Sequence, residues 1–237
     1  MWQGKTLTLS GREAHHLSRV LRVTPGATID LFDGKGHSGR ALVARVGRGE
    51  VELQLQEKRL AKPPSFQITL GCAIPKGTFE EVIREATQLG AVAILPLVTA
   101  RGEVKISAQE FSKKKRRFSQ IAIESGKQSG VLRLPVLLAL SSFRDALATF
   151  SQYDLVLMAA VEGPHEKLTT LLANGDIHRV LLLVGPEGDF TPEEMSAASS
   201  AGVKRISLGP NILRCKTAAI SALSIVSFIL REKEAAR

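Results

Sequence analysis

Two glycine-rich loops hold the residues whose types and spacing could do chemistry. The first, Gly185-Pro186-Glu187-Gly188-Asp189-Phe190, follows an apolar run and is followed by a helix start. It lacks the Lys-Ser/Thr of a P-loop and the GxGxxG of a dinucleotide site. Its acidic residues would also repel phosphate from the helix start. The loop therefore favours a neutral or cationic ligand, and the alternative is a turn whose glycines serve only its shape.

The second loop places one arginine among apolar residues at the end of another apolar run. Its sequence is Leu208-Gly209-Pro210-Asn211-Ile212-Leu213-Arg214, and it lies just before the C-terminal helix. A cation in that position can stabilise an anionic substrate or transition state. The alternative is that Arg214 pairs with a nearby carboxylate.

The overall charge indicates a second kind of ligand. The 237 residues include 32 lysines and arginines against 23 acidic residues, which gives a net charge of +9. A surplus of this size suits a polyanion such as nucleic acid, although a basic but ordinary enzyme would also fit.

The cysteines and the apolar segments limit where the protein works. Cys72 and Cys215 are far apart and form no CxxC, which argues for a reducing compartment and against a zinc or disulfide framework. The first residues lack the apolar core of a signal peptide, and the apolar segment 217–230 is too short to span a bilayer. We expect a soluble, cytoplasmic protein without a metal.

The elements before residue 63 predict a small β-rich unit that resembles a barrel. Strands are expected at 28–32, 40–46 and 51–56, each bounded by glycine turns, and a helix at 15–23. The segment 61–65, Ala-Lys-Pro-Pro-Ser, breaks the periodicity and predicts a linker. The first domain is therefore expected at 1–63.

The elements from residue 66 to 237 predict an α/β domain. Strands are expected at five places: 66–74, 91–98, 153–160, 179–185 and 203–209. Helices alternate with them, and Ser107 with Glu110 and Thr191 with Glu194 have the spacing of capping boxes. This order predicts a mostly parallel sheet covered on both faces, with ligands at the carboxyl ends of the strands.

The two loops and several other segments together resemble a known family. The matching segments are 13–23, 26–36, 72–97, 127–135, GPEGDF at 185–190 and LGPNILRCKTAAISAL at 208–223. They are similar to the RsmE family of SPOUT RNA methyltransferases, which methylate N3 of a uridine in 16S ribosomal RNA. The resemblance implies a PUA-like β-barrel followed by a SPOUT-type parallel sheet with a C-terminal deep trefoil knot.

The resemblance also implies ligands and site residues. The methyl donor would be S-adenosylmethionine, the partner would be the 16S rRNA of the small ribosomal subunit, and the protein would be a homodimer. The expected cofactor-binding residues are Val184, Gly185, Pro186, Glu187, Gly188, Leu208, Gly209, Asn211, Ile212 and Leu213. The expected RNA-binding residues are His16, Arg19, Arg22, Lys76, Gln128 and Arg133.

The reaction predicts two catalytic roles. N3 of uracil carries a proton and is a poor nucleophile until that proton leaves, so the site needs a base or a stabilising cation. Arg214 is the expected cation, and Glu187 or a water molecule would accept the proton. Cys215 is expected to be a small packed residue, because methyl transfer needs no cysteine nucleophile.

Five positions depart from the family pattern and leave alternatives open. Glutamates of the family are replaced by Gln88, Lys127 and Lys216, an arginine by Val131, and a glycine by Asp189. One hypothesis is that the acids and the arginine formed a charge network that was replaced as a unit. Another is altered catalysis, and the alternatives for function are a knotted methyltransferase with another RNA target or a non-catalytic RNA-binding factor.

Overall fold

The computed structural model describes residues 5–173 and 175–236 and divides the chain into two compact units, Met1–Pro63 and Pro64–Arg237. The first expected domain begins at residue 1 and the second ends at residue 237, but residues 1–4 and 237 lie outside the described residues.

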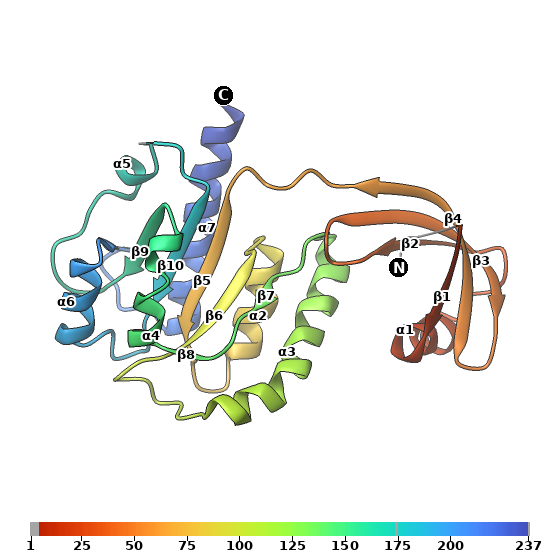
Figure 1. Ribbon diagram of the computed structural model, residues 1–237, viewed down its shortest axis with the longest axis horizontal. Helices are drawn as coiled ribbons and strands as arrows, with labels where there is room; N and C mark the ends of the chain where they lie inside the picture. Colours follow the sequence, from red (N-terminus) through yellow and green to blue (C-terminus); the bar gives the residue numbers. More distant parts are fainter. Residues whose placement is uncertain (1–4, 174, 237) are drawn as a thin grey trace. The chain divides into compact units, whose positions relative to one another are not determined.

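The first unit is built on a four-stranded antiparallel sheet (Figure 1). Its strands are β1 (Thr6–Ser10), β2 (Thr28–Phe32), β3 (His37–Val46) and β4 (Glu50–Leu60), in the order β1-β4-β3-β2. Val51 and Leu53 are fully buried, as the alternation of β4 predicts, and they pack with Leu17 of the helical segment. The β-rich character predicted for this unit is confirmed, with β1 and β2 at the sheet edges.

The helix predicted at 15–23 differs in extent and type. The helical segment begins earlier, with α1 (Gly11–His15), and continues as a π-helical turn, η1 (His16–Val20). The amide of Leu21 donates to the carbonyl of His16, so the turn is wider than that of an α-helix. Arg22 lies beyond the helix with φ of 51°, a left-handed conformation that reverses the chain.

The second unit contains a parallel sheet in the order β11-β9-β10-β5-β6-β7, with β8 also paired to β6. The strands are β5 (Gln67–Ala73), β6 (Ala93–Val98), β7 (Val136–Leu137), β8 (Ser141–Ser142), β9 (Leu155–Ala159), β10 (Arg179–Val184) and β11 (Lys204–Ile206). The five strands predicted here are present, and the parallel α/β sheet is confirmed. The sheet order places the ends of β9, β10 and β11 side by side.

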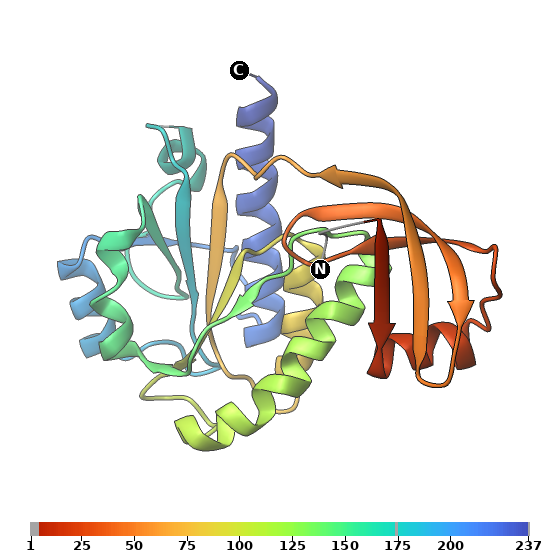
Figure 2. The same ribbon diagram turned by 45° about the vertical axis from the view of Figure 1, so that its right-hand side comes forward.

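Helices cover both faces of this sheet (Figure 2). One face packs on α2 (Phe79–Gln88), α3 (Ala108–Ser129), α5 (Leu168–Ala173) and α7 (Cys215–Ala235), and the other on α4 (Phe143–Leu147), η2 (Phe150–Gln152) and α6 (Pro192–Ser200). Strand β10 alternates between them: Leu182 faces the first group, whereas Leu181 and Leu183 face the second. A strand buried on both faces has to be apolar throughout, which explains the run that precedes the first glycine loop.

Two capping boxes fix where α3 and α6 begin. Ser107 accepts a hydrogen bond from the amide of Glu110 at the start of α3. Thr191 does the same with Glu194 at the start of α6, and Pro192 occupies the first turn. Both helix starts are therefore as predicted, and the second fixes the end of the Gly185–Phe190 loop.

Candidate functional site: a cleft at the carboxyl ends of three strands

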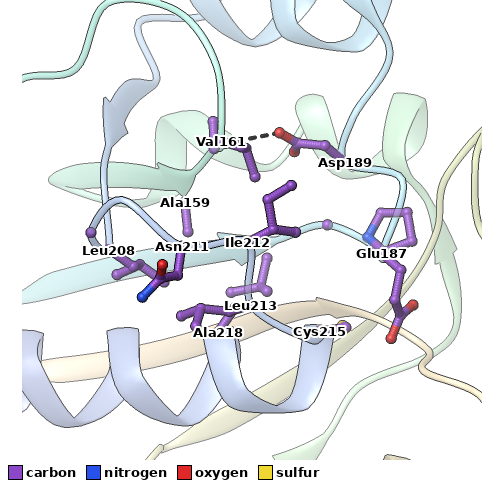
Figure 3. A pocket seen from close by; sticks show the side chains of 15 residues that line it. Ala159, Val161, Glu187, Asp189, Leu208, Asn211, Ile212, Leu213, Cys215 and Ala218 are labelled. Atoms are coloured by element: carbon purple, nitrogen blue, oxygen red, sulfur yellow. Dashed lines mark hydrogen bonds between the residues drawn. The ribbon is translucent and has the colours of Figure 1, made fainter.

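Loops that follow three neighbouring parallel strands form a cleft of about 530 Å³, open to solvent (Figure 3). Its lining comes from the ends of β9 and β10, the loop after β11 and the first turn of α7: Ala159, Ala160, Val161, Val184, Gly185, Pro186, Glu187, Asp189, Leu208, Gly209, Asn211, Ile212, Leu213, Cys215 and Ala218. The position at the carboxyl ends of the strands is the one predicted for a ligand.

The structure brings together the residues predicted to bind the cofactor. All of them except Gly188 line this one cleft, although they come from two separate segments of the chain. The carbonyl of Gly188 instead accepts a hydrogen bond from Nη1 of Arg101, at 2.8 Å. Gly188 therefore serves to hold its loop against the segment after β6.

Two glycines of the cleft are required by its geometry. A Cβ atom at Gly185 would lie 3.1 Å from the ring of Phe190, which is completely buried beneath the loop. Gly209 has φ of 121°, a conformation that other residues rarely adopt. These constraints explain why the two loops contain glycine at these positions.

Asp189 occupies a tight turn with φ of 58° and is one of two non-glycine residues with positive φ among those described. Its amide donates to the carbonyl of Pro186 at 2.9 Å, which closes the turn. Its Oδ1 accepts from the amide of Phe190 at 2.8 Å, and its Oδ2 accepts from the amide of Val161 at 2.9 Å. Aspartate adopts this left-handed conformation more readily than most residues, so the turn forms without a glycine at this position.

The two cysteines, 143 residues apart in the sequence, meet beneath the cleft. Their sulfur atoms are 3.7 Å apart and both side chains are buried as free thiols. The hydrogen bond with Cys215, together with complete burial, raises the pKa of the Cys72 thiol. Two buried free thiols in contact with each other form a packing contact, as predicted for Cys215, and are shielded from reacting as nucleophiles.

The residues predicted to be catalytic lie at the edge of the cleft. Glu187 lines it and is exposed to solvent. Arg214 is exposed at the N-cap of α7, between Leu213 and Cys215, which both line the cleft. Within the described residues no carboxylate forms an ion pair with Arg214, so the pairing considered as its alternative role is not found.

The residues predicted to bind RNA are distributed over both units. In the first unit, Arg19 and Arg22 are exposed and His16 is half-buried. A spacing of three residues would place these side chains near one face of an α-helix, but the structure forms no α-helix over them. His16 and Arg19 lie in the π-helical turn, and Arg22 lies outside the helix.

In the second unit, the predicted RNA-binding residues lie at opposite edges of the sheet. Lys76 is exposed in the loop after β5, at the carboxyl edge where the cleft lies. Gln128 lies in the last turn of α3, and Arg133 lies between that helix and β7, which places both at the amino edge. The structure does not gather these three residues into one site within this unit.

The residues that depart from the family pattern have partners of their own. Lys216 of α7 forms ion pairs with Glu81 and Glu85 of α2, with nitrogen–oxygen distances of 2.5 and 3.9 Å. Gln88 donates to the side chain of Gln128 at 3.5 Å, and Lys127 lies 3.7 Å from Glu124. The hydrogen bond with Glu81 raises the pKa of Lys216, and the same bond lowers the pKa of Glu81.

Sequence reasoning missed one of the walls of the cleft. Ala159, Ala160 and Val161 follow β9 and line it, yet no motif singles them out. Their only signal in the sequence was that they end a predicted strand of a parallel sheet. Asp189 was noted as a departure from the family and not as a lining residue.

Two kinds of site are not found in the described part of the chain. Residues 5–173 and 175–236 contain no cluster of histidine, cysteine, aspartate or glutamate that could hold a metal ion. Over the same residues, no helix is long and apolar enough to cross a membrane.

Known families and structures match both units. A family model described as the RNA methyltransferase PUA domain matches residues 9–56, and one described as the RNA methyltransferase domain matches 62–227. Ribosomal RNA small subunit methyltransferase E of Synechocystis sp. is 33% identical over 95% of this chain and 74% of its own length.

Two similar crystal structures contain a bound methyl donor. A ribosomal RNA small subunit methyltransferase E from Neisseria gonorrhoeae, bound to S-adenosyl methionine, has a TM-score of 0.85 and 28% identity over 97% of this chain and 94% of that one. A putative methyltransferase from Legionella pneumophila, also with this cofactor, has a TM-score of 0.83 and 29% identity over 95% and 92%. The chain therefore belongs to the RNA methyltransferase family that the matching models describe, and is a relative of the ribosomal RNA small subunit methyltransferases E.

Proposed function

We propose that this protein transfers a methyl group from S-adenosylmethionine to N3 of a uridine in the 16S rRNA of the small ribosomal subunit. The observation that carries the proposal is the cleft: both glycine loops of the family pattern line it, and its ionisable lining includes Glu187 and Asp189 but no lysine or arginine. Such a lining suits a donor that has a cationic sulfur and no phosphate. The rRNA target follows from the named relatives.

The cleft residues fit this donor in polarity and in shape. The apolar side chains of Leu208, Ile212 and Leu213 provide surface for the adenosine, and backbone at Gly185 and Gly209 can approach it closely. The trefoil knot that the family implies remains a prediction, because threading of the chain is not established by the strand order.

The proposed chemistry uses two side chains of this chain. S-adenosylmethionine supplies a methyl group that its positive sulfur already activates. Arg214 stabilises the negative charge that develops on the uracil as N3 loses its proton. Glu187, directly or through water, accepts that proton. The main task of the remaining residues is to hold the two ligands in line, which can lower the barrier by several kcal/mol.

The two units divide the binding of the ligands. We propose that residues 1–63 form a PUA-like RNA-binding domain, with Arg19 and Arg22 on phosphates, and that residues 66–237 carry the transfer. The protein would act in the cytoplasm, where ribosomal subunits are assembled. Exposed Ile225 and Phe228 on α7, with 42% and 64% of their surface accessible, support a homodimer that covers this helix.

Methyl transfer to isolated small subunits tests the proposal. Subunits from a strain that lacks the corresponding methyltransferase are incubated with the protein and tritiated donor, and the label is mapped by nuclease digestion and mass spectrometry. We expect label at N3 of a single uridine of 16S rRNA. Label at another atom or in another RNA would contradict the substrate assignment.

Binding measurements separate an enzyme from an RNA-binding factor that has lost activity. Isothermal titration of the full chain with S-adenosylmethionine should show saturable binding. If RNA binds and the donor does not, the protein is a non-catalytic RNA-binding factor. The partners found for Lys216 and Gln88 lie outside the cleft lining, so the structure gives no reason to expect that result.

A further inference from the structure

Asp189 joins two walls of the cleft through its side chain. Its carboxylate accepts a hydrogen bond from the amide of Val161, which follows β9 (Figure 3), and another from the amide of Phe190 in its own loop. A glycine at this position could make neither hydrogen bond, so the link between the two walls depends on the side chain of Asp189.

The two hydrogen bonds also fix a negative charge against the ligand space. Asp189 is half-buried and lines the cleft together with Glu187, which is exposed to solvent. A charge held in place at a partly buried site is screened by water and salt less than a mobile, exposed one. Of the two carboxylates, Asp189 therefore has the larger influence on how strongly a charged ligand binds.

Donor and product of the proposed reaction differ by one positive charge. The donor has a sulfonium, and loss of the methyl group leaves a neutral thioether in S-adenosylhomocysteine. The rest of the two molecules is the same, so shape and hydrogen bonding discriminate little between them. A fixed negative charge beside the ligand discriminates through Coulomb attraction.

We propose that Asp189 is a specificity-determining residue, whose carboxylate favours the charged methyl donor over the neutral product, so that the donor competes more effectively with the product for the cleft. The inference rests on the proposed function, because it requires S-adenosylmethionine in this cleft. It goes beyond that function in assigning to one residue the preference between the two forms of the cofactor.

Two substitutions at Asp189 separate its charge from its hydrogen bonds. Asp189→Asn removes the charge, tolerates the left-handed turn and keeps an acceptor oxygen for one of the two amides. Asp189→Gly suits the positive φ and removes both the charge and the hydrogen bonds. Glu193→Gln is the matched control, because Glu193 is an exposed carboxylate four residues away that does not line the cleft.

The measured quantity is the ratio of the dissociation constants for S-adenosylhomocysteine and S-adenosylmethionine, determined by isothermal titration on the full chain. We expect this ratio to fall on the order of fivefold in both Asp189 variants, equivalent to about 1 kcal/mol, and to stay unchanged in Glu193→Gln. In turnover assays, Asp189→Asn should be more sensitive to inhibition by the product.

The possible outcomes distinguish this inference from the proposed function. If both ligands bind and Asp189→Asn leaves their ratio unchanged, the inference is wrong and the proposed function stands. A ratio that falls in Asp189→Gly and not in Asp189→Asn would assign discrimination to the hydrogen bonds and overturn the charge argument. If the wild type binds neither ligand, both are wrong. Thermal melting of each ligand-free variant establishes that it is folded.

Discussion

The first unit and the cofactor cleft carry opposite charges within one basic chain. Residues 1–63 contain eleven lysines and arginines against six acidic residues. The ionisable lining of the cleft includes Glu187 and Asp189 and no basic side chain. The difference teaches that a net charge of +9 describes neither region, because basic residues are in surplus in one and acidic side chains are the charged groups of the other.

The two regions also differ in how their charges are held. Several arginines of the first unit are fully exposed, and some pair with acidic neighbours on the sheet, as Arg45 does with Glu52. In the cleft, the carboxylate of Asp189 accepts hydrogen bonds from two backbone amides. Exposed charges act at long range and are weakened by salt, whereas fixed ones in a concave site discriminate between small ligands. Each prediction below changes one region; the first three are read by ligand binding or turnover, and the last by stability.

The largest effect is expected from Arg214→Ala. Loss of the cation should lower kcat by about a hundredfold or more, as removal of one oxyanion-stabilising donor does in other enzymes. Binding of the donor, measured by titration, should hardly change. Arg144→Ala removes an exposed arginine from α4 and serves as the control. Equal losses in both variants would contradict a catalytic role for Arg214.

Gly209→Val should abolish most donor binding and leave RNA binding intact. Valine cannot adopt φ of 121° without strain, so the Leu208–Leu213 wall of the cleft would be displaced. Titration should show affinity for the donor weakened by roughly tenfold or more, since strain of this kind is worth about 1–3 kcal/mol. If RNA affinity falls to the same degree, the separation of the two binding regions is wrong.

The double variant Arg19→Gln and Arg22→Gln should weaken RNA binding about tenfold at low salt, because it removes two phosphate contacts. The affinity for RNA of the wild type should also fall more steeply with salt than that of the variant. Arg45→Gln is the matched control in the same unit, because Arg45 already pairs with Glu52. If either variant changes the affinity for the donor, the two regions do not bind their ligands separately.

The smallest effect is expected from Lys216→Glu, which alters the support of the cleft. It places a third carboxylate beside Glu81 and Glu85, so the melting temperature should fall by a few degrees, and by less in Lys216→Gln. An unchanged melting temperature would contradict this. Adding Glu81→Lys should restore part of the loss.

The effect of Lys216 also depends on pH in a defined direction. The lysine lowers the pKa of Glu81, so its stabilisation is present above the pKa of an unfolded-state glutamate and is lost as the pH falls through the lower folded-state value. The difference in melting temperature between wild type and Lys216→Gln should therefore shrink in acid. If the difference in melting temperature stays constant as the pH falls through the folded-state pKa of Glu81, the ion pair contributes nothing to stability.

Much of the α/β unit was predictable because its signals are local. Apolar runs identified the five main strands, and serine or threonine three residues before glutamate identified two helix starts. The helix near residue 15 was less predictable. Its π-helical turn and the left-handed Arg22 depend on packing against the sheet of the first unit, which residue spacing does not encode.

The sequence by itself determined the chemistry of the two loops. Glycines, acids and a lone arginine are properties of short segments, and they argued against phosphate and favoured a neutral or cationic ligand. Only the tertiary structure decided what faces these segments. The bond from Val161 to Asp189, the contact of Cys72 with Cys215 and the pairing of Lys216 with Glu81 join residues 28, 143 and 135 positions apart. Contacts of such range are set by strand order and helix packing, so no pattern within a segment could predict them.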